Sequence, residues 1–173
     1  KKDKKIASLI TQTVVSKNDP KLAQPFPSKP IGPYFTELEA KKLRSNTNHI
    51  FKKVKPNGVK TWRRVVPSPK PLEIVELDIL KELAEDSCLL IAAGGGGIPV
   101  IKNGSGFEGV DCVIDKDRSA SLLAKSIKAS VLLLLTDIDK VKLNYGKSDE
   151  SLKLVITGKD AKKFQDDEQF LEG

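Results

Sequence analysis

Short apolar runs alternate with polar segments along the whole chain, and most of these runs are rich in Ile, Leu and Val. Apolar runs of this length with many β-branched residues predict strands rather than helices. The predicted strands are residues 6–15, 50–54, 59–66, 88–93, 98–101, 109–114 and 131–135. Residues 88–93 and 131–135 are apolar throughout, which is typical of strands that are buried on both faces of a sheet.

Segments with apolar residues at helical spacing separate several of these runs. A helix is predicted to begin at Thr36, because Thr36 and Glu39 have the spacing of a capping box. The other predicted helices are residues 72–84, 117–128 and 159–164. Strands that alternate with helices in this way predict an α/β sandwich around a mostly parallel sheet.

Prolines mark off one part of the chain. Residues 16–33 contain five prolines, which predict a long loop because proline disrupts both helices and central strands. Asn57 and Gly58 lie between two β-rich runs, a pattern typical of a β-hairpin. Prolines at both ends therefore set residues 16–69 apart as a small subdomain.

The charge is distributed unevenly over the 173 residues, a length that predicts one domain with one core. The net charge is +13 over residues 1–70 and −6 over residues 71–173. A basic half suggests a phosphate-bearing partner, either nucleic acid or a small anionic metabolite, and a lysine-rich solvated surface explains it equally well. We expect no nucleic-acid partner, because aromatic residues are not regularly interleaved among the basic ones; residues 62–64 come nearest to that pattern.

The composition also bears on cellular location. No apolar stretch has the length of a membrane span, and the start of the chain lacks the apolar core of a signal peptide. We therefore expect no membrane partner and a cytoplasmic location, with Cys88 and Cys112 as reduced thiols. The chain contains no methionine, even at position 1, which indicates that it is part of a longer translated product.

Three polar or glycine-rich segments follow predicted strands. These segments are Gly94, Gly95, Gly96 and Gly97; Asp115, Lys116 and Asp117; and Thr136 and Asp137. Because ligands of open α/β sheets bind at the carboxyl ends of the strands, we expect all three segments to line one crevice.

Four successive glycines allow the backbone to approach a ligand closely, although a tight structural turn is the alternative. No Gly-Lys-Ser/Thr follows them, which excludes a Walker A loop. Pro99 stands where a dinucleotide-binding fingerprint requires its last glycine, which excludes that fingerprint as well.

The charged segment has two interpretations from its residues alone. Lys116 between two acids is a fixed positive charge suited to a transferring phosphate group, but Asp117 could equally cap the following helix. Lys17, taken alone, is a surface lysine. His49 is the single histidine, so we expect neither a metal site nor a Ser-His-Asp triad. Lysines, glycines and acids suit phosphoryl transfer, which depends on positioning and charge neutralisation.

Six blocks of the sequence together resemble the carbamate kinases of the amino-acid-kinase superfamily. The blocks are residues 11–20, 28–34, 62–69, 94–100, 113–117 and 135–137. The resemblance implies a three-layer αβα sandwich and a homodimer that interconverts ATP plus carbamate and ADP plus carbamoyl phosphate with Mg²⁺. It also implies ATP formation during arginine fermentation, and a protruding lid formed by residues 16–69.

The same resemblance implies roles for individual residues. Lys17 would reach the carbamate or the transferring phosphoryl group from the lid. Lys116 would contact nucleotide phosphates, and Asp117 would organise the active-site lysines. The adenosine site would include Thr136, Asp137 and Tyr145, and the four glycines would border the substrate.

The chain also departs from the family. A Gly-Gly-Asn turn and a His-Gly-Asn-Gly-Pro-Gln-like segment are missing, and Gly173 matches only the first glycine of a Gly-Ser-Met-Gly-Pro-Lys segment. Residues 57–61 replace a Gly-Arg-Gly-like stretch of the lid. Residues 1–173 are thus interpreted as one amino-acid-kinase domain that is incomplete at both ends and inactive by itself. A related amino-acid or acyl-phosphate kinase and a non-catalytic nucleotide-binding remnant are the alternatives.

Overall fold

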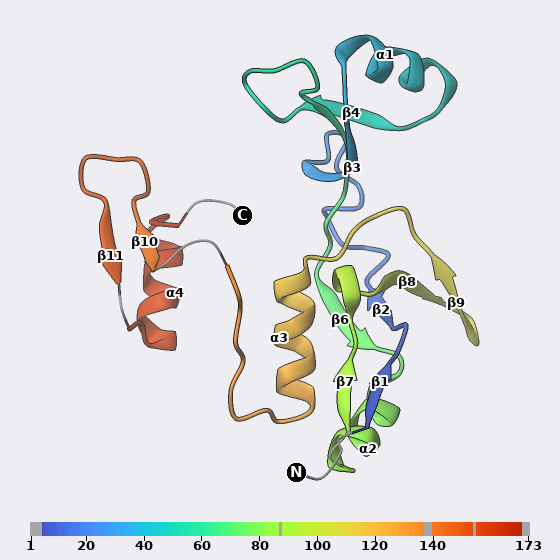
Figure 1. Ribbon diagram of the computed structural model, residues 1–173, viewed down its shortest axis with the longest axis vertical. Coiled ribbons are helices and arrows are strands. Elements are labelled where there is room, and N and C mark those ends of the chain that lie inside the picture. The colour runs from blue at the N-terminus through green and yellow to red at the C-terminus, as the bar shows by residue number, and fades with distance from the viewer. Residues whose placement is uncertain (1–4, 87, 137–139, 154, 171–173) are drawn as a thin grey trace. The chain divides into compact units, whose positions relative to one another are not determined.

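The computed structural model describes residues 5–86, 88–136, 140–153 and 155–170 (Figure 1). Asp137 and Gly173, which the sequence singled out, lie outside these residues. The chain divides into two compact units, Lys1–Leu132 and Leu133–Gly173, and each is described by itself. Helices are interspersed among the strands of the first unit, so the predicted α/β class is confirmed.

The central strands of the first unit form two sheets. The strands are β1 (Ile6–Ser8), β2 (Gln12–Val15), β6 (Pro71–Ile74), β7 (Leu89–Ile91), β8 (Ile98–Asn103) and β9 (Gly106–Gly109). β1 pairs with β7, and the other four pair in the order β6-β2-β8-β9. Parallel pairing holds β1 to β7 and β2 to β8, whereas β6 and β9 are antiparallel to their neighbours.

The core of these sheets is aliphatic. Val15, Ile74, Val100 and Ile114 are each at most 3% exposed. Helix α2 (Leu77–Glu85) packs against β7, and helix α3 (Lys116–Ser126) packs against β6. Since α3 begins two residues after the buried Ile114, its first turn is anchored to the core.

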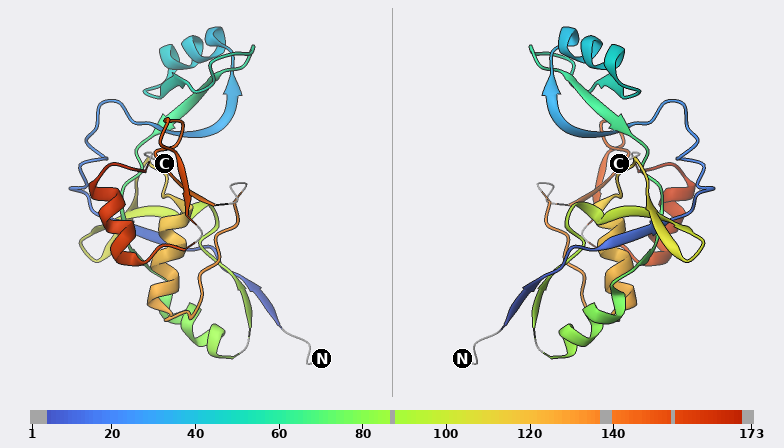
Figure 2. Two further views of the ribbon diagram at one scale, coloured as in Figure 1. Left: turned by 90° about the vertical axis from the view of Figure 1, so that its left-hand side faces the viewer. Right: turned by 90° about the vertical axis from the view of Figure 1, so that its right-hand side faces the viewer.

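A separate three-stranded antiparallel sheet lies within residues 29–66. Its elements are β3 (Lys29–Phe35), α1 (Glu37–Asn46), β4 (Ile50–Lys53) and β5 (Trp62–Val66), in the strand order β3-β5-β4. Figure 2 shows α1 beside these strands, and the rings of Phe35 and Phe51 meet edge-on at 5.5 Å. Both arms of the predicted capping box at Thr36 form, and the predicted hairpin is confirmed by β4 and β5.

The predicted proline-rich loop is wrong over its last residues, because residues 29–33 belong to β3. Pro30 and Pro33 are tolerated there since β3 is an edge strand of its sheet and one side needs no hydrogen-bond donors. The ladder with β5 is also interrupted between Ile31 and Phe35. Proline density therefore identified the edge of a sheet rather than a loop.

Four other predicted elements have different bounds. Residues 6–15 form two strands, β1 and β2, which lie in different sheets. The helix predicted at 72–84 begins at Leu77, because Pro71–Ile74 pairs with β2. The strand predicted at 109–114 lies earlier, as β9, because a short turn returns the chain directly after β8. The strand predicted at 88–93 is shorter, and Leu89 and Ile91 of β7 are 54% and 58% exposed instead of buried.

The second unit contains a short antiparallel hairpin and one helix. These elements are β10 (Val141–Leu143), β11 (Ser151–Lys153) and α4 (Gly158–Asp166). The capping box of Thr157 and Asp160 opens α4, and the helix predicted at 159–164 is confirmed.

The strand predicted at residues 131–135 is wrong, because these residues form no ladder with any described strand. Their side chains are not buried; Leu135, for example, is 87% exposed. An apolar run becomes a strand only where a neighbouring strand supplies hydrogen bonds. Among the described residues, no helix is both long and apolar enough to cross a membrane.

Candidate functional site

The four glycines form a tight, hydroxyl-bound turn between β7 and β8, here called the glycine loop (residues 94–97). Gly96 and Gly97 have φ values of 99° and 84°, in the region that favours glycine. The carbonyl oxygen of Gly96 accepts hydrogen bonds from Thr13 Oγ1 at 2.9 Å and from Ser119 Oγ at 2.7 Å. Both side chains are fully buried, so the loop is fixed between β2 and the first turn of α3.

Two of these glycines also lie where a side chain has no space. A Cβ at Gly96 would overlap the carbonyl oxygen of Ile114 and lie 2.9 Å from the Ile114 Cβ. A Cβ at Gly97 would overlap Thr13 Oγ1. The glycine loop therefore contacts the residue that immediately precedes Asp115. The structure thus brings together two of the three segments that were predicted to line one crevice.

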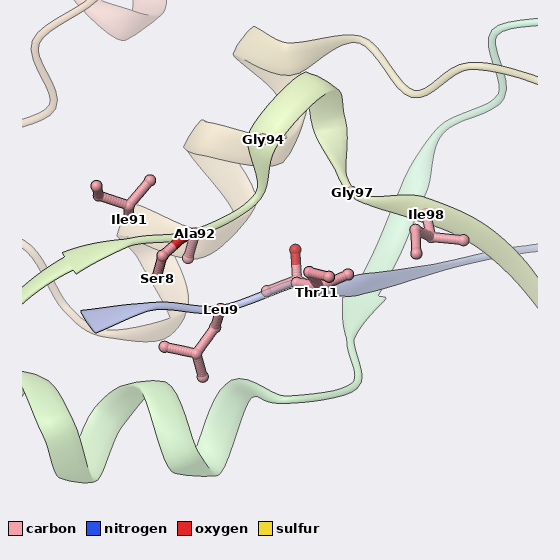
Figure 3. Close-up of a pocket in the computed structure, with 9 residues that line it drawn as sticks. Ser8, Leu9, Thr11, Ile91, Ala92, Gly94, Gly97 and Ile98 are labelled. Carbon is pink, nitrogen blue, oxygen red and sulfur yellow. The ribbon is translucent and has the colours of Figure 1, made fainter.

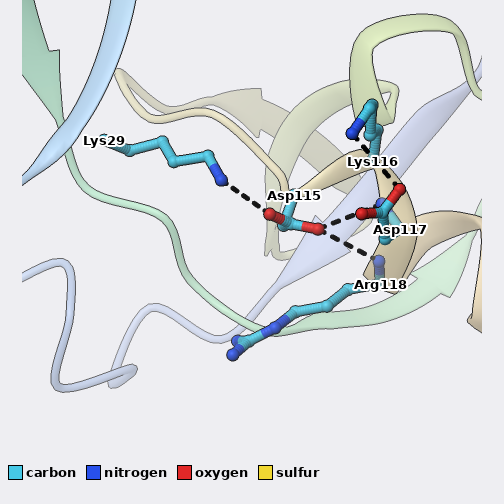
Figure 4. Close-up of polar contacts among 5 residues, drawn as sticks. All are labelled: Lys29, Asp115, Lys116, Asp117 and Arg118. Carbon is cyan, nitrogen blue, oxygen red and sulfur yellow. Dashed lines mark hydrogen bonds and ion pairs between the residues drawn. The ribbon is translucent and has the colours of Figure 1, made fainter. Parts of the chain in front are cut away.

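Asp115 is the N-cap of α3, and its side chain is the best-connected group at this end of the helix. Its Oδ1 accepts hydrogen bonds from the backbone N–H groups of Asp117 at 3.0 Å and Arg118 at 3.3 Å (Figure 4). Its Oδ2 forms an ion pair with Lys29 Nζ at 2.6 Å. The helix cap is therefore Asp115, and the suggestion that Asp117 caps the helix is wrong.

Lys116 and Asp117 form a second, open ion pair in the first turn of α3. The distance between Lys116 Nζ and Asp117 Oδ1 is 3.3 Å, and the two side chains are 74% and 53% exposed. The sequence suggested a lysine held between two acids. In the structure Lys116 pairs with the following acid, while the preceding Asp115 is bound to Lys29. Lys116 and Asp117 are thus open to an approaching ligand.

The other predicted site residues lie elsewhere in the chain. Lys17 is exposed in the turn after β2, and its side chain forms no hydrogen bond or ion pair with the described residues. Thr136 and Tyr145 belong to the second unit, where the Tyr145 ring lies 5.1 Å from Lys142 Nζ. Asp137 is outside the described residues. A shared site for these residues and Lys116 therefore stays a prediction.

Sequence reasoning assigned no chemistry to Lys29. The residue lies in one of the blocks that carried the family resemblance, next to Pro30, but nothing local shows that its ammonium group meets Asp115, 86 positions away. The pairing of β3 with β5 brings this ammonium group there, and the first residues of β3 were predicted to be part of a loop.

The model of the Amino acid kinase family matches residues 19–169 of this chain. The chain belongs to the amino acid kinase family. It is 40% identical over 171 residues to the carbamate kinase of Thermococcus kodakarensis, covering 99% of this chain and 53% of that protein. It is 41% identical over 170 residues to the carbamate kinase of Thermoplasma acidophilum, covering 98% of this chain and 53% of that protein.

Solved structures give the same result for this amino acid kinase chain. Carbamate kinase from Giardia lamblia bound to AMP-PNP superimposes with a TM-score of 0.79 and 38% identity, covering 98% of this chain and 52% of that one. A protein from Aeropyrum pernix K1 gives a TM-score of 0.81 with 36% identity, covering 96% and 52%. The chain thus spans about half the length of the relatives it matches.

A shallow hollow of about 230 Å³ lies beside the glycine loop of this amino acid kinase chain. Its walls are residues 8–11 on one side and Ile91, Ala92, Gly94, Gly97 and Ile98 on the other (Figure 3). Most of these side chains are aliphatic, and Ile91 and Ile98 are about half exposed. The hollow therefore offers apolar contact rather than charge.

Cys112 lies three residues before Asp115, and we expect it to be unreactive. Burial, with smaller effects of Asp111 and Asp19, raises the pKa of its thiol to about 12. Because the thiolate is the nucleophile, a Cys88→Ser variant should react with iodoacetamide roughly 100-fold more slowly than N-acetylcysteine at about pH 8. Mass spectrometry of timed samples measures the rate. A denaturing concentration of urea should restore it, and fast labelling of the folded protein would contradict the burial of the thiol.

Proposed function

We propose that the protein containing this chain is a carbamate kinase, which transfers a phosphoryl group between ATP and carbamate. The observation that carries the proposal is the identity of about 40% to carbamate kinases over nearly the whole chain. The open Lys116–Asp117 pair beside the glycine loop supports it. An exposed ammonium group next to a rigid turn is suited to hold the charged oxygens of a phosphoryl group.

Each site residue has a proposed task. Lys116 binds the phosphate oxygens of the nucleotide, and Asp117 orients that ammonium group through their ion pair. Lys17 acts on the carbamate side, and the glycine loop borders the substrate. Residues 16–69 form a lid, of which the sheet β3-β5-β4 is the ordered framework.

The adenosine site of the proposed kinase lies in the second unit. Thr136, Asp137 and Tyr145 are its proposed residues. Tyr145 is 54% exposed, so a large part of its surface is available for contact with a nucleotide.

The proposal includes Mg²⁺ as the ion that accompanies ATP. No group of three or more His, Cys, Asp or Glu residues able to hold a metal occurs in the part of the chain that the structure describes. That agrees with the usual binding of Mg²⁺ through substrate phosphates and one or two carboxylates rather than a protein cage. The exposed carboxylate of Asp117 fits such a contact, and the ion would neutralise phosphate charge. A homodimer, a cytoplasmic location and a place in arginine breakdown complete the proposal.

An assay of ATP formation tests the function. The whole protein that contains this chain is mixed with ADP, Mg²⁺ and carbamoyl phosphate, and luciferase measures the ATP formed while carbamate is released. We expect ATP to form with carbamoyl phosphate and not with acetyl phosphate. ATP-dependent phosphorylation of glutamate, aspartate or acetylglutamate, without reaction of carbamoyl phosphate, would favour the related acyl-phosphate kinases. Binding of AMP-PNP with no turnover of any of these compounds would favour a non-catalytic nucleotide-binding protein.

A further inference from the structure

The ion pair between Lys29 and Asp115 joins two segments that are far apart in the sequence. Lys29 is the first residue of β3, and Asp115 precedes the first residue of α3. The Lys29 side chain is 37% exposed and the Asp115 side chain 18%. The pair is thus partly shielded, in contrast to the open pair of Lys116 and Asp117 beside it.

Asp115 cannot move easily, because each of its carboxylate oxygens is in use. Oδ1 caps the helix, and the backbone carbonyl oxygen of Asp115 accepts a hydrogen bond from the N–H of Ser119 at 3.0 Å. The preceding Ile114 is 1% exposed and touches the glycine loop. The N–H of Val113 donates to the carbonyl oxygen of Pro67 at 3.0 Å. The carboxylate is therefore a fixed point.

The electrostatics of Asp115 agree with this geometry. Burial alone would raise the pKa of its carboxyl group. The ammonium group of Lys29 and the backbone N–H groups of Arg118 and Asp117 outweigh burial and keep the pKa below its ordinary value. Asp115 thus stays ionised near neutral pH and keeps its attraction for Lys29.

A lysine ammonium group has three donors, and the ion pair with Asp115 uses one of them. The remaining donors can serve an anion that arrives at the same helix terminus. A lysine without a fixed partner would distribute its ammonium group over many rotamers, and only a few of these would point to the site.

We propose that Asp115 is a positioning residue, which holds the ammonium group of Lys29 at the start of α3 as a second cation for the transferring phosphoryl group. Lys29 and Lys116 then approach the start of α3 from different sides, as Figure 4 shows. This inference rests on the proposed function, because it assigns Lys29 and Asp115 to the same reaction.

The Asp115→Asn variant separates the two tasks of this side chain. Asparagine caps helices as well as aspartate does, so α3 should keep its cap while the charge is lost. We expect kcat for ATP formation to fall about 10- to 100-fold, with KM for ADP changed less than about twofold, because a displaced catalytic group slows chemistry more than binding. The matched control is Asp111→Asn, which removes the ion pair of Arg64 without touching α3 and should leave kcat unchanged.

A double-mutant cycle tests whether Asp115 acts through Lys29. In a Lys29→Met background, Asp115→Asn should cause little further loss of kcat, because the group that it positions is gone. If the kcat losses of the two single variants multiply in the double variant, the inference is wrong. An Asp115→Asn enzyme with wild-type kcat would overturn it as well. If the wild-type protein forms no ATP, the proposed function fails instead.

A titration tests the pair independently of activity. The ¹³C signal of the Asp115 carboxyl group, followed by NMR, should show a midpoint that rises in Lys29→Met and stays unchanged in Lys116→Met. If the titration midpoint of Asp115 is the same in Lys29→Met as in the wild type, the ion pair does not exist in solution. That result would overturn the inference whatever the kinetics show.

Discussion

Replacement of Gly96 by alanine should destabilise the first unit by about 3–5 kcal/mol, near the upper end of single-residue effects. Two costs add at this position. The φ of 99° lies where side chains with a Cβ are strained, and the new Cβ would overlap the backbone of Ile114. Relief of the overlap would move the Gly96 carbonyl away from Thr13 and Ser119, and would leave two buried hydroxyl groups without their acceptor.

Urea unfolding, monitored by circular dichroism, measures this effect. Alanine variants at two other positions of the glycine loop serve as controls. A methyl group added at Gly94 would meet no atom within 4 Å, and the φ of Gly94 is ordinary, so Gly94→Ala should change stability by less than about 0.5 kcal/mol. Gly95 has the same space but a φ of 63°, so Gly95→Ala should cost about 1 kcal/mol from the backbone alone. Equal stabilities of all three variants would contradict the close packing of the loop on Ile114.

The parts of the fold that sequence predicted well are those fixed by neighbouring residues. The predicted capping box at Thr36 formed because its donors and acceptors lie three residues apart. The hairpin around Asn57 and Gly58 required only two β-rich runs and a turn. The partners lie three positions apart in the capping box and 9 to 15 positions apart in the hairpin, so one short stretch of sequence contains the whole interaction.

The parts that failed depend on partners that a local pattern cannot name. The prolines of residues 29–33 predict a loop from the sequence alone. In the structure these residues pair with β5 as an edge strand, where proline is tolerated. Residues 131–135 look like a buried strand, yet they pair with no described strand. An apolar run records that a segment can be buried or paired, and only tertiary structure decides whether it is.

The candidate site shows the same division. Apolar strands followed by glycine or charge predicted that three segments would line one crevice. The close approach of Gly96 to Ile114 brings two of them together, the glycine loop and residues 115–117. The choice of partner within the charged segment was not predictable. Asp115 and Asp117 are both sequence neighbours of Lys116. In the structure, however, Asp115 caps the helix and its carboxylate pairs with Lys29 instead.

Replacement of Lys116 by methionine should lower kcat for ATP formation about 1,000-fold, if the protein is the proposed kinase. Methionine keeps most of the length and apolar volume of lysine but removes the charge. Lys116 is 74% exposed, and its described ion pair is with Asp117, so folding should not suffer. The loss would therefore report on the stabilisation of phosphoryl charge. In steady-state kinetics with varied ADP, we expect the loss of activity to be seen in kcat. The KM for ADP should also increase if Lys116 binds ADP in the ground state.

The control for this variant lies on the same helix. Lys125 is in the last turn of α3, where its charge interacts favourably with the helix terminus but is far along the helix from Asp115. Lys125→Met should cost a few tenths of a kcal/mol in stability and leave kcat within about twofold of wild type. Similar kinetics for the two variants would mean that a general loss of positive charge, and not the position at the start of α3, causes the effect. A Lys116→Met protein that retains wild-type kcat would remove this helix terminus from the proposed reaction.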